Sequence, residues 1–187
     1  MIGLKRCKIC LEGGMIMARV LFISDSHGLT EEIGLVKDQV GSVDQLIHCG
    51  DSELEQDADE LEGFVKVRGN CDADARLPNQ QTIRIGELNF LVTHGHLHEV
   101  KAGLTTLSNS AAEVNATVIG FGHTHIAGAE KVEDQLFINP GSIRLPRSIP
   151  ERTYAVMEWN KLDEICVSFY TLEGKIVEAL TYHTSLL

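Results

Sequence analysis

The sequence has no long apolar run and comparatively few basic residues. The first shortage argues against a membrane-spanning protein, and the second argues against a protein that coats nucleic acid. No apolar segment approaches the roughly 20 residues that a membrane-spanning helix requires, so such helices are not expected. The 187 residues include 16 lysines and arginines against 27 aspartates and glutamates, a formal net charge of −11. Because nucleic-acid coating relies on a basic face, this charge argues against general nucleic-acid binding.

Cysteine is also scarce for a disulfide-stabilised protein. The five cysteines are an odd number, are widely separated and follow no secretory signal, which favours reduced thiols and a cytoplasmic location. Cys7 and Cys10 have the spacing of half a zinc site, but no second pair follows at the spacing of a zinc ribbon. Residues 1–16 show no helix or strand periodicity. We therefore expect an N-terminal extension, explained by a start site assigned too early, and then a single domain over 17–187.

From Met17 onward, short apolar runs alternate with helical patterns. Two stripes with spacings of three and four residues predict amphipathic helices: Leu29, Ile33, Val36 and Val40, then Val100, Leu104, Leu107, Ala111 and Val114. Apolar or alternating runs predict strands at 20–24, 46–47, 64–67, 82–85, 88–93, 117–120, 129–132, 135–138, 154–159, 164–170 and 175–181. The order is βαβ-like first and hairpins later, which predicts two sheets with helices outside them.

Histidine is the residue type that points to chemistry. Seven of the eight histidines gather in short segments that also contain aspartate, asparagine and glycine, and only His183 stands alone. Histidines that serve only packing would be scattered, so the clustering indicates a metal site or an acid–base site.

Five polar segments stand at the C-terminal ends of predicted strands: Asp25-Ser26-His27, Gly50-Asp51, Gly69-Asn70, Thr93-His94-Gly95-His96 and Gly122-His123-Thr124-His125. Strand ends of this kind converge on one crevice in open α/β sheets. Imidazole and carboxylate ligands suit Mn, Fe, Zn or Ni. The candidate ligands in these segments are Asp25, His27, Asp51, Asn70, His94, His123 and His125. Seven ligands are too many for one tetrahedral ion, but they fit two ions about 3.5–4 Å apart that share a carboxylate. That arrangement is used for displacement at phosphorus. The two ions would also make the site positive within an acidic protein, as an anionic phosphoester needs.

Each of these residues taken alone has a simpler explanation. Asp25 and Asp51 could cap helices, Asn70 could occupy a turn, and His94 could be a satisfied histidine at a strand end. His123 and His125 are individually ambiguous. The ordered combination, and not any single residue, favours the metal site.

The same five segments resemble the motifs of the calcineurin-like metallophosphoesterase superfamily, and 17–182 is similar to its compact bacterial and archaeal phosphodiesterase branch. Asn139-Pro140-Gly141-Ser142 also recurs in that branch. The resemblance implies an α/β fold, a four-layer αββα sandwich of two mixed sheets flanked by helices. It also implies two divalent metal ions, with Mn expected and Fe, Zn or Ni as alternatives.

By the same resemblance, each of the seven ligands has a place. Asp25, His27 and His125 would hold one ion, Asn70, His94 and His123 would hold the other, and Asp51 would bridge them. Asp51, Asn70 and His94 would also take part in catalysis. A hydroxide held by the metals would be the nucleophile, attacking phosphorus in line with the leaving oxygen.

One position departs from the family pattern. Many members carry histidine after the asparagine of the fourth motif, where it helps to protonate the leaving group, whereas this chain has Cys71. Cys71 could act as a weak acid with a pKa near 8.5 or simply fill space. His96 and His98 are close enough in sequence to substitute for the missing histidine. We therefore expect cleavage of phosphodiesters, with phosphomonoesters slower.

Two other functions remain open. A eukaryotic retromer subunit resembles this compact fold and acts as a protein-interaction scaffold after losing some metal ligands, so the fold alone does not establish catalysis. A small phosphomonoesterase would use the same ligands. We expect a small phosphoester as the substrate and no interaction with membranes. Whether the chain forms a homo-oligomer is left open.

Overall fold

The computed structural model describes residues 18–187. The expectations for 1–16, which concern the extension, the Cys7 and Cys10 pair and the start at Met17, lie outside the described residues and stay predictions. No helix within 18–187 is long and apolar enough to cross a membrane. None of the cysteines in that range forms a disulfide.

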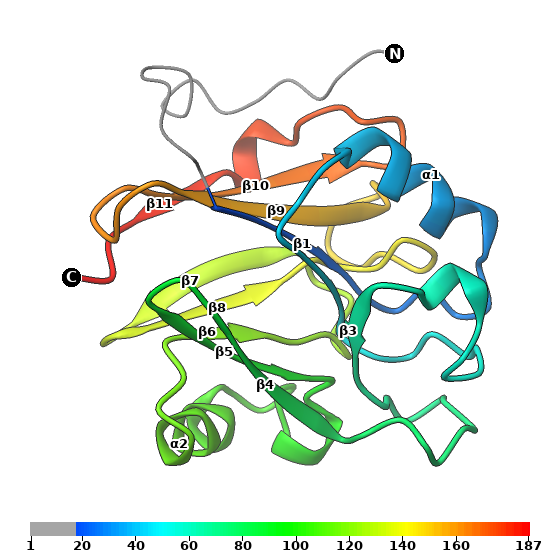
Figure 1. The fold of residues 1–187 in the computed structure, drawn as a ribbon, viewed down its shortest axis with the longest axis horizontal. Coiled ribbons are helices and arrows are strands. Elements are labelled where there is room, and N and C mark those ends of the chain that lie inside the picture. The colour runs from blue at the N-terminus through cyan, green and yellow to red at the C-terminus, as the bar shows by residue number, and fades with distance from the viewer. Residues whose placement is uncertain (1–17) are drawn as a thin grey trace.

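The strands form two mixed sheets, as the sequence predicts (Figure 1). The first sheet has the order β11-β10-β9-β1-β2-β3, and the second has the order β4-β5-β6-β8-β7. Strands of the first sheet are β1 (Ala18–Ile23), β2 (Gln45–His48), β3 (Phe64–Lys66), β9 (Thr153–Trp159), β10 (Ile165–Thr171) and β11 (Tyr182–Thr184). Strands of the second are β4 (Gln80–Ile85), β5 (Leu88–Thr93), β6 (Val118–Gly120), β7 (Gly128–Val132) and β8 (Gln135–Asn139).

The two sheets pack face to face, and a helix covers the outer side of each (Figure 1). Strand β1 shows why, because its side chains alternate between two cores. Val20 and Phe22 belong to the core between the sheets, whereas Leu21 and Ile23 face the core beneath α1 (Glu31–Val40). The other helix, α2 (Thr105–Glu113), covers the outer side of the second sheet. The architecture is therefore the expected αββα sandwich.

Helix α1 follows directly from its sequence. Ile33, Val36 and Val40 are buried on one face, at the spacing that a helix requires. Glu31 lies in the first turn and Lys37 in the last, and both charges complement the helix dipole.

Two expected elements differ from the structure. Residues 175–181 do not form a strand; they contain a 3₁₀-helix, η4 (Glu178–Leu180), and the last strand begins only at Tyr182. The second predicted helix was expected from Val100, but α2 starts at Thr105. Gly103 explains the later start, since its φ of +150° is incompatible with a right-handed helix. Two further 3₁₀-helices, η2 (Asp59–Leu61) and η3 (His96–His98), lie in connecting loops.

The topology brings the polar segments together. Strands β1, β2 and β3 are parallel neighbours in the first sheet, and β5 and β6 are parallel neighbours in the second. The segments that follow these five strands therefore emerge from the carboxyl edges of both sheets, where ligand sites form in α/β proteins.

Candidate metal centre

Backbone hydrogen bonds hold the segments of the site against one another. Asp25 N donates to Gly50 O at 3.0 Å, and His27 N donates to Asp51 O at 2.9 Å, which joins the loops after β1 and β2. Gly122 N donates to His94 O at 3.1 Å, which joins the loops after β5 and β6. The positions of the functional side chains are therefore fixed by main-chain contacts between neighbouring strands.

Five of the expected ligands share an uncommon backbone conformation. All five have positive φ angles, which side-chain-bearing residues rarely adopt: Asp25 (53°), His27 (43°), Asp51 (52°), His123 (66°) and His125 (60°). Strain of this kind concentrates at functional sites, where the surrounding fold maintains it.

Two glycines allow the loops to approach this closely. A Cβ on Gly69 would collide with the Asp51 carboxylate, and one on Gly122 would collide with the side chain of Ser24. The motif glycines are thus required by the close packing of the loops.

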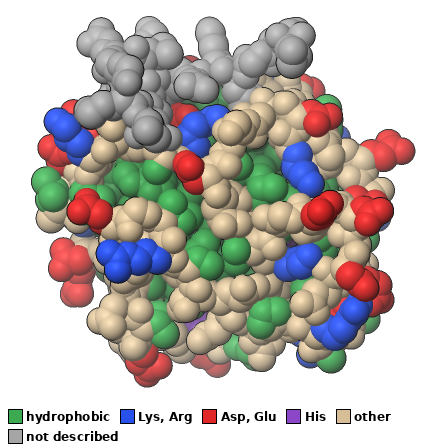
Figure 2. All heavy atoms as spheres, viewed as in Figure 1, with side chains coloured by type: hydrophobic (Ala, Val, Ile, Leu, Met, Phe, Trp, Pro, Cys, Tyr) green, Lys and Arg blue, Asp and Glu red, His purple; other side chains and the backbone are tan. Residues whose placement is uncertain are grey.

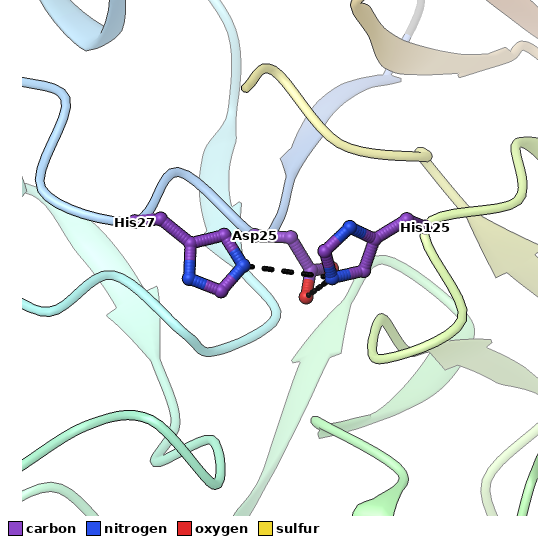
Figure 3. A group of neighbouring side chains, drawn as sticks. All are labelled: Asp25, His27 and His125. Atoms are coloured by element: carbon purple, nitrogen blue, oxygen red, sulfur yellow. Dashed lines mark hydrogen bonds and ion pairs between the residues drawn. The ribbon is translucent and has the colours of Figure 1, made fainter. Parts of the chain in front are cut away.

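The first group of ligand atoms comes from Asp25, His27 and His125, whose side chains point toward one another (Figure 3). Asp25 Oδ1 lies 3.0 Å from His125 Nε2, and His27 Nε2 lies 3.5 Å from His125 Nε2. A second group consists of Asp25, Asp51 and His94. His94 Nε2 lies 3.2 Å from Asp51 Oδ2 and 3.9 Å from Asp25 Oδ1. Asp25 therefore connects the two groups.

Hydrogen bonds on the far side of each ring determine where its lone pair points. His94 Nδ1 is 2.8 Å from Cys49 O, and His125 Nδ1 is 2.7 Å from Leu145 O. A carbonyl oxygen can only accept, so both Nδ1 atoms carry the proton and both Nε2 atoms have the lone pair. His27 Nδ1 contacts Glu53 Oε1 at 2.7 Å and is fixed in the same way. In the neutral state, three imidazole lone pairs thus face the Asp25 and Asp51 carboxylates.

Buried acceptors that converge in this way require a cation. Asp25 and His94 are fully buried, and while the histidine rings are neutral Asp25 Oδ1 and His94 Nε2 have no hydrogen-bond donor facing them. In the metal-free chain a proton fills this role in part. Burial disfavours charge on His94, but the bond to Asp51 and the charge of Asp25 outweigh it and raise the His94 pKa. The hydrogen bond to Asp25 likewise raises the pKa of His125, against the effect of burial. Divalent ions fit the same atoms, because oxygen and imidazole nitrogen are their usual ligands.

His123 and Asn70, the other two expected ligands, belong to neither of these two groups of ligand atoms. The His123 ring lies with its centroid 5.2 Å from that of His94, and its backbone N donates to Asp25 Oδ2 at 3.2 Å. Burial, with the charges of His94 and Lys101, lowers the pKa of His123 to about 4, so the ring stays neutral at pH 7. Asn70 is exposed, and its Nδ2 donates to Cys71 Sγ at 3.2 Å.

Cys71 lies at the site but is not acidic. Its Sγ is close to ligand atoms of His27 and Asp51, and its backbone N donates to Asp51 Oδ1 at 2.7 Å. Burial and the Asp51 carboxylate raise the thiol pKa to about 11. Nearby, the His96 ring lies 5.3 Å from that of His94, centroid to centroid.

Two acidic residues that support the site were not among the expected residues. Glu53 orients His27, as described above. Asp72 is buried and accepts four hydrogen bonds, from Asp51 N, Ser52 Oγ, Glu53 N and Gly69 N. The only signal in the sequence is that each acid lies within two residues of an expected ligand.

Little of this chemistry is visible from the side drawn in Figure 2. On that face, acidic and basic side chains are scattered around the rim with apolar side chains between them, and little histidine reaches the surface. Most of the histidine cluster is buried, in agreement with exposures of 8% for both His27 and His125.

Comparison with known proteins identifies the family. Residues 18–162 match the calcineurin-like phosphoesterase superfamily domain. The chain belongs to this superfamily. It is 45% identical over 168 residues to "Probable metallophosphoesterase YsnB" of Bacillus subtilis, covering 89% of this chain and 99% of the relative. It is 27% identical over 121 residues to "Phosphodiesterase YfcE" of Escherichia coli, covering 60% of this chain and 61% of that protein.

Solved structures support the fold. A predicted phosphoesterase from Streptococcus pneumoniae superposes with a TM-score of 0.86 at 34% identity, covering 92% of this chain and 99% of that one. Vps29 of Entamoeba histolytica complexed with Zn²⁺ superposes with a TM-score of 0.71 at 22% identity, covering 90% of this chain and 99% of that one. At that identity the likeness to Vps29 concerns the fold alone.

Proposed function

We propose that this superfamily member is a metal-dependent phosphodiesterase with a dinuclear centre. The observation that carries the proposal is the convergence of the lone pairs of His27, His94 and His125 on the Asp25 and Asp51 carboxylates. Divalent ions bound there would lower the pKa of a water molecule and neutralise charge on the phosphoryl oxygens.

The chain's own residues divide into two sets of ligands. Asp25, His27 and His125 would hold one ion, and their mutual contacts support this assignment. The other ion would be held by His94 and His123, whose rings are neighbours, together with Asn70. Asp51 would bridge the ions, since it neighbours His94 through Oδ2 and also groups with His27.

The raised thiol pKa of Cys71 makes it a poor proton donor to a leaving group, so substrates with good leaving groups are favoured. The preference for diesters over monoesters is supported by the name of the relative YfcE, a phosphodiesterase. We also propose Mn as the working metal, with Fe, Zn and Ni as alternatives, and a cytoplasmic location.

The scaffold function fits the site less well. A protein that serves only as a binding surface has no need to keep seven ligand positions filled, nor to orient His27, His94 and His125 by separate hydrogen bonds. A phosphomonoesterase would use the same centre and is distinguished by substrate preference.

The test is a substrate panel with defined metals. The full chain is stripped with a chelator, reloaded separately with Mn, Fe, Zn or Ni, and given bis(p-nitrophenyl) phosphate, p-nitrophenyl phosphate and 2′,3′-cyclic nucleotides. We expect the diesters to be cleaved fastest, only with metal, and best with Mn. Failure to cleave any of them with any metal would overturn the enzyme function and favour the scaffold.

A further inference from the structure

Three exposed basic side chains lie beside the candidate metal centre, although the chain as a whole is acidic. These are Lys101, whose charge acts on His123, Arg147, whose charge acts on His125, and Arg144, which lies near Gly28. Within 18–187, none of the three forms an ion pair with a carboxylate, whereas Arg19 pairs with Glu158 and Arg76 with three acids. Basic side chains that have no carboxylate partner, next to a centre proposed to bind a phosphoester, are available to bind an anionic ligand.

The segment that carries the two arginines is attached to the loops of the metal centre. Ser142 Oγ donates to Asp25 O at 2.7 Å, and it accepts from the backbone N of Arg144 at 3.1 Å. Arg147 N donates to His125 O at 2.9 Å, and Arg147 also pairs with Ile126 in an isolated parallel bridge. The backbones of both arginines are therefore fixed relative to ligands of the first ion.

The side chains of the arginines stay near these loops. Arg144 Nη1 lies 3.7 Å from the position that a Cβ on Gly28 would occupy, next to His27 in the chain. The charge of Arg147 acts on His125, although the bond to Asp25 dominates the pKa of that ring. Glu53 also lies beside these ligands, and its carboxylate contacts the His27 ring.

Lys101 lies in a different environment. It lines a cavity of about 560 Å³ together with Phe121, Thr124 and Ile126, but Glu130 lines the same cavity. The acid offsets the charge of Lys101 there, so the arginine side is the better place for a second anion.

On this basis we propose that the substrate carries a second phosphate besides the reacting one, and that Arg144 and Arg147 bind this second group. Guanidinium groups suit the role because they present paired donors to phosphate oxygens. The substrate class is a small phosphoester with an additional phosphate, such as a nucleoside bisphosphate ester. The inference rests on the proposed function for the place of the reacting phosphate.

Two chromogenic diesters that differ only by one phosphate test the proposal. They are the p-nitrophenyl ester of thymidine 5′-phosphate and the same ester with a 3′-phosphate, and both release p-nitrophenol on diester cleavage. With the Mn-loaded chain we expect kcat/KM to be on the order of tenfold higher for the 3′-phosphorylated ester, mainly through KM. Arg144→Gln and Arg147→Gln should each bring the ratio of the two values toward one.

Arg84→Gln is the matched control. Arg84 lies on β4, and its Nε donates to Gly86 O, away from the ligand loops. The ratio should be unchanged in this variant, and Lys101→Gln should change it less than either arginine variant does. An unchanged ratio in both arginine variants, or equal rates for the two esters with the unaltered chain, would overturn the inference.

A binding experiment separates this inference from the proposed function. Calorimetry with the Mn-loaded chain compares thymidine 3′,5′-bisphosphate with thymidine 5′-phosphate. If neither ester is cleaved but the bisphosphate binds about tenfold more tightly and loses this advantage in the arginine variants, the second-phosphate site stands and the hydrolase proposal fails. If the esters are cleaved but the two nucleotides bind equally, the hydrolase stands and the second-phosphate site fails.

Discussion

The Nε2 atom of His94 lies 3.2 Å from Oδ2 of Asp51, and both side chains are buried. Because the His94 Nδ1 proton is bonded to Cys49 O, this short contact needs either a second proton or a metal ion between the two residues.

Asp51→Asn should reduce the metal content more than any other single change of a ligand. The amide keeps the size of the side chain but removes one negative charge from the position between the two proposed ions, where Coulomb interactions are worth several kcal/mol. His125→Ala removes a ligand of one ion only and should lower the metal content less, while both variants lose most turnover. Elemental analysis beside circular dichroism measures this. About two ions per chain in folded Asp51→Asn would show that Asp51 is not the bridge.

Glu53→Gln should weaken metal binding without unfolding the chain. The Glu53 carboxylate fixes the proton on His27 Nδ1 and so leaves Nε2 for the metal, and loss of such a partner typically lowers metal affinity roughly 10- to 100-fold. The neighbouring Glu55 is exposed and pairs with Arg76 instead, so Glu55→Gln is the control. Competition with a fluorescent chelator gives both metal affinities, and equal affinities for the two variants would show that Glu53 does not support metal binding.

The gain in stability on adding Mn should increase as the pH rises through the neutral range. Asp51 and Asp25 raise the folded-state pKa values of His94 and His125, so protonation of these rings stabilises the metal-free chain below pH ~6.5 and this stabilisation is lost as the pH rises through the folded pKa values. Metal ions replace those protons and bind better as they leave.

Thermal unfolding of the chelated and Mn-loaded chain between pH 5.5 and 8.5 measures this gain. Burial lowers the pKa of His48 to about 4, below this pH range, so His48 stays neutral in the folded chain with or without Mn. Its effect on stability is therefore the same in both forms and cancels in the difference. A gain that is constant with pH would contradict the assigned protonation of the two rings.

Asp72→Asn should destabilise the fold as well as the site. Each Asp72 oxygen accepts two hydrogen bonds, and an amide group would turn its NH₂ toward two of those donors. Two buried donors without acceptors cost roughly 2–6 kcal/mol of unfolding free energy. Urea denaturation measures this cost, with the exposed Asp38→Asn on α1 as the control. A cost near zero would mean that Asp72 is dispensable for holding the loops.

The positions of the expected ligands could be predicted because they depend on strand order. Val20–Ile23, the core of β1, is apolar throughout, so the sequence marks where the strand ends and where Asp25 begins a loop. The parallel neighbours β1 and β2 then bring Asp25 and Asp51 together, and the packing of the second sheet against the first adds His94 from the end of β5.

The supporting residues could not be predicted in this way. The contact of Glu53 with His27 depends on positive φ angles at both residues, and no apolar periodicity encodes those angles. The late start of α2 has a similar cause, because Gly103 interrupts an otherwise continuous helical stripe. At 175–181, apolar residues follow a strand-like pattern, but only Ile176 makes an isolated bridge, to Tyr170.

Titration of the chelated chain with Mn during hydrolysis of bis(p-nitrophenyl) phosphate measures how many ions turnover requires. With the protein far above the dissociation constant, we expect no hydrolysis without metal and a rate that reaches its plateau at about two ions per chain. Hydrolysis that persists after chelation, or no hydrolysis after two ions per chain have bound, would show that the chain is not a metal-dependent phosphoesterase.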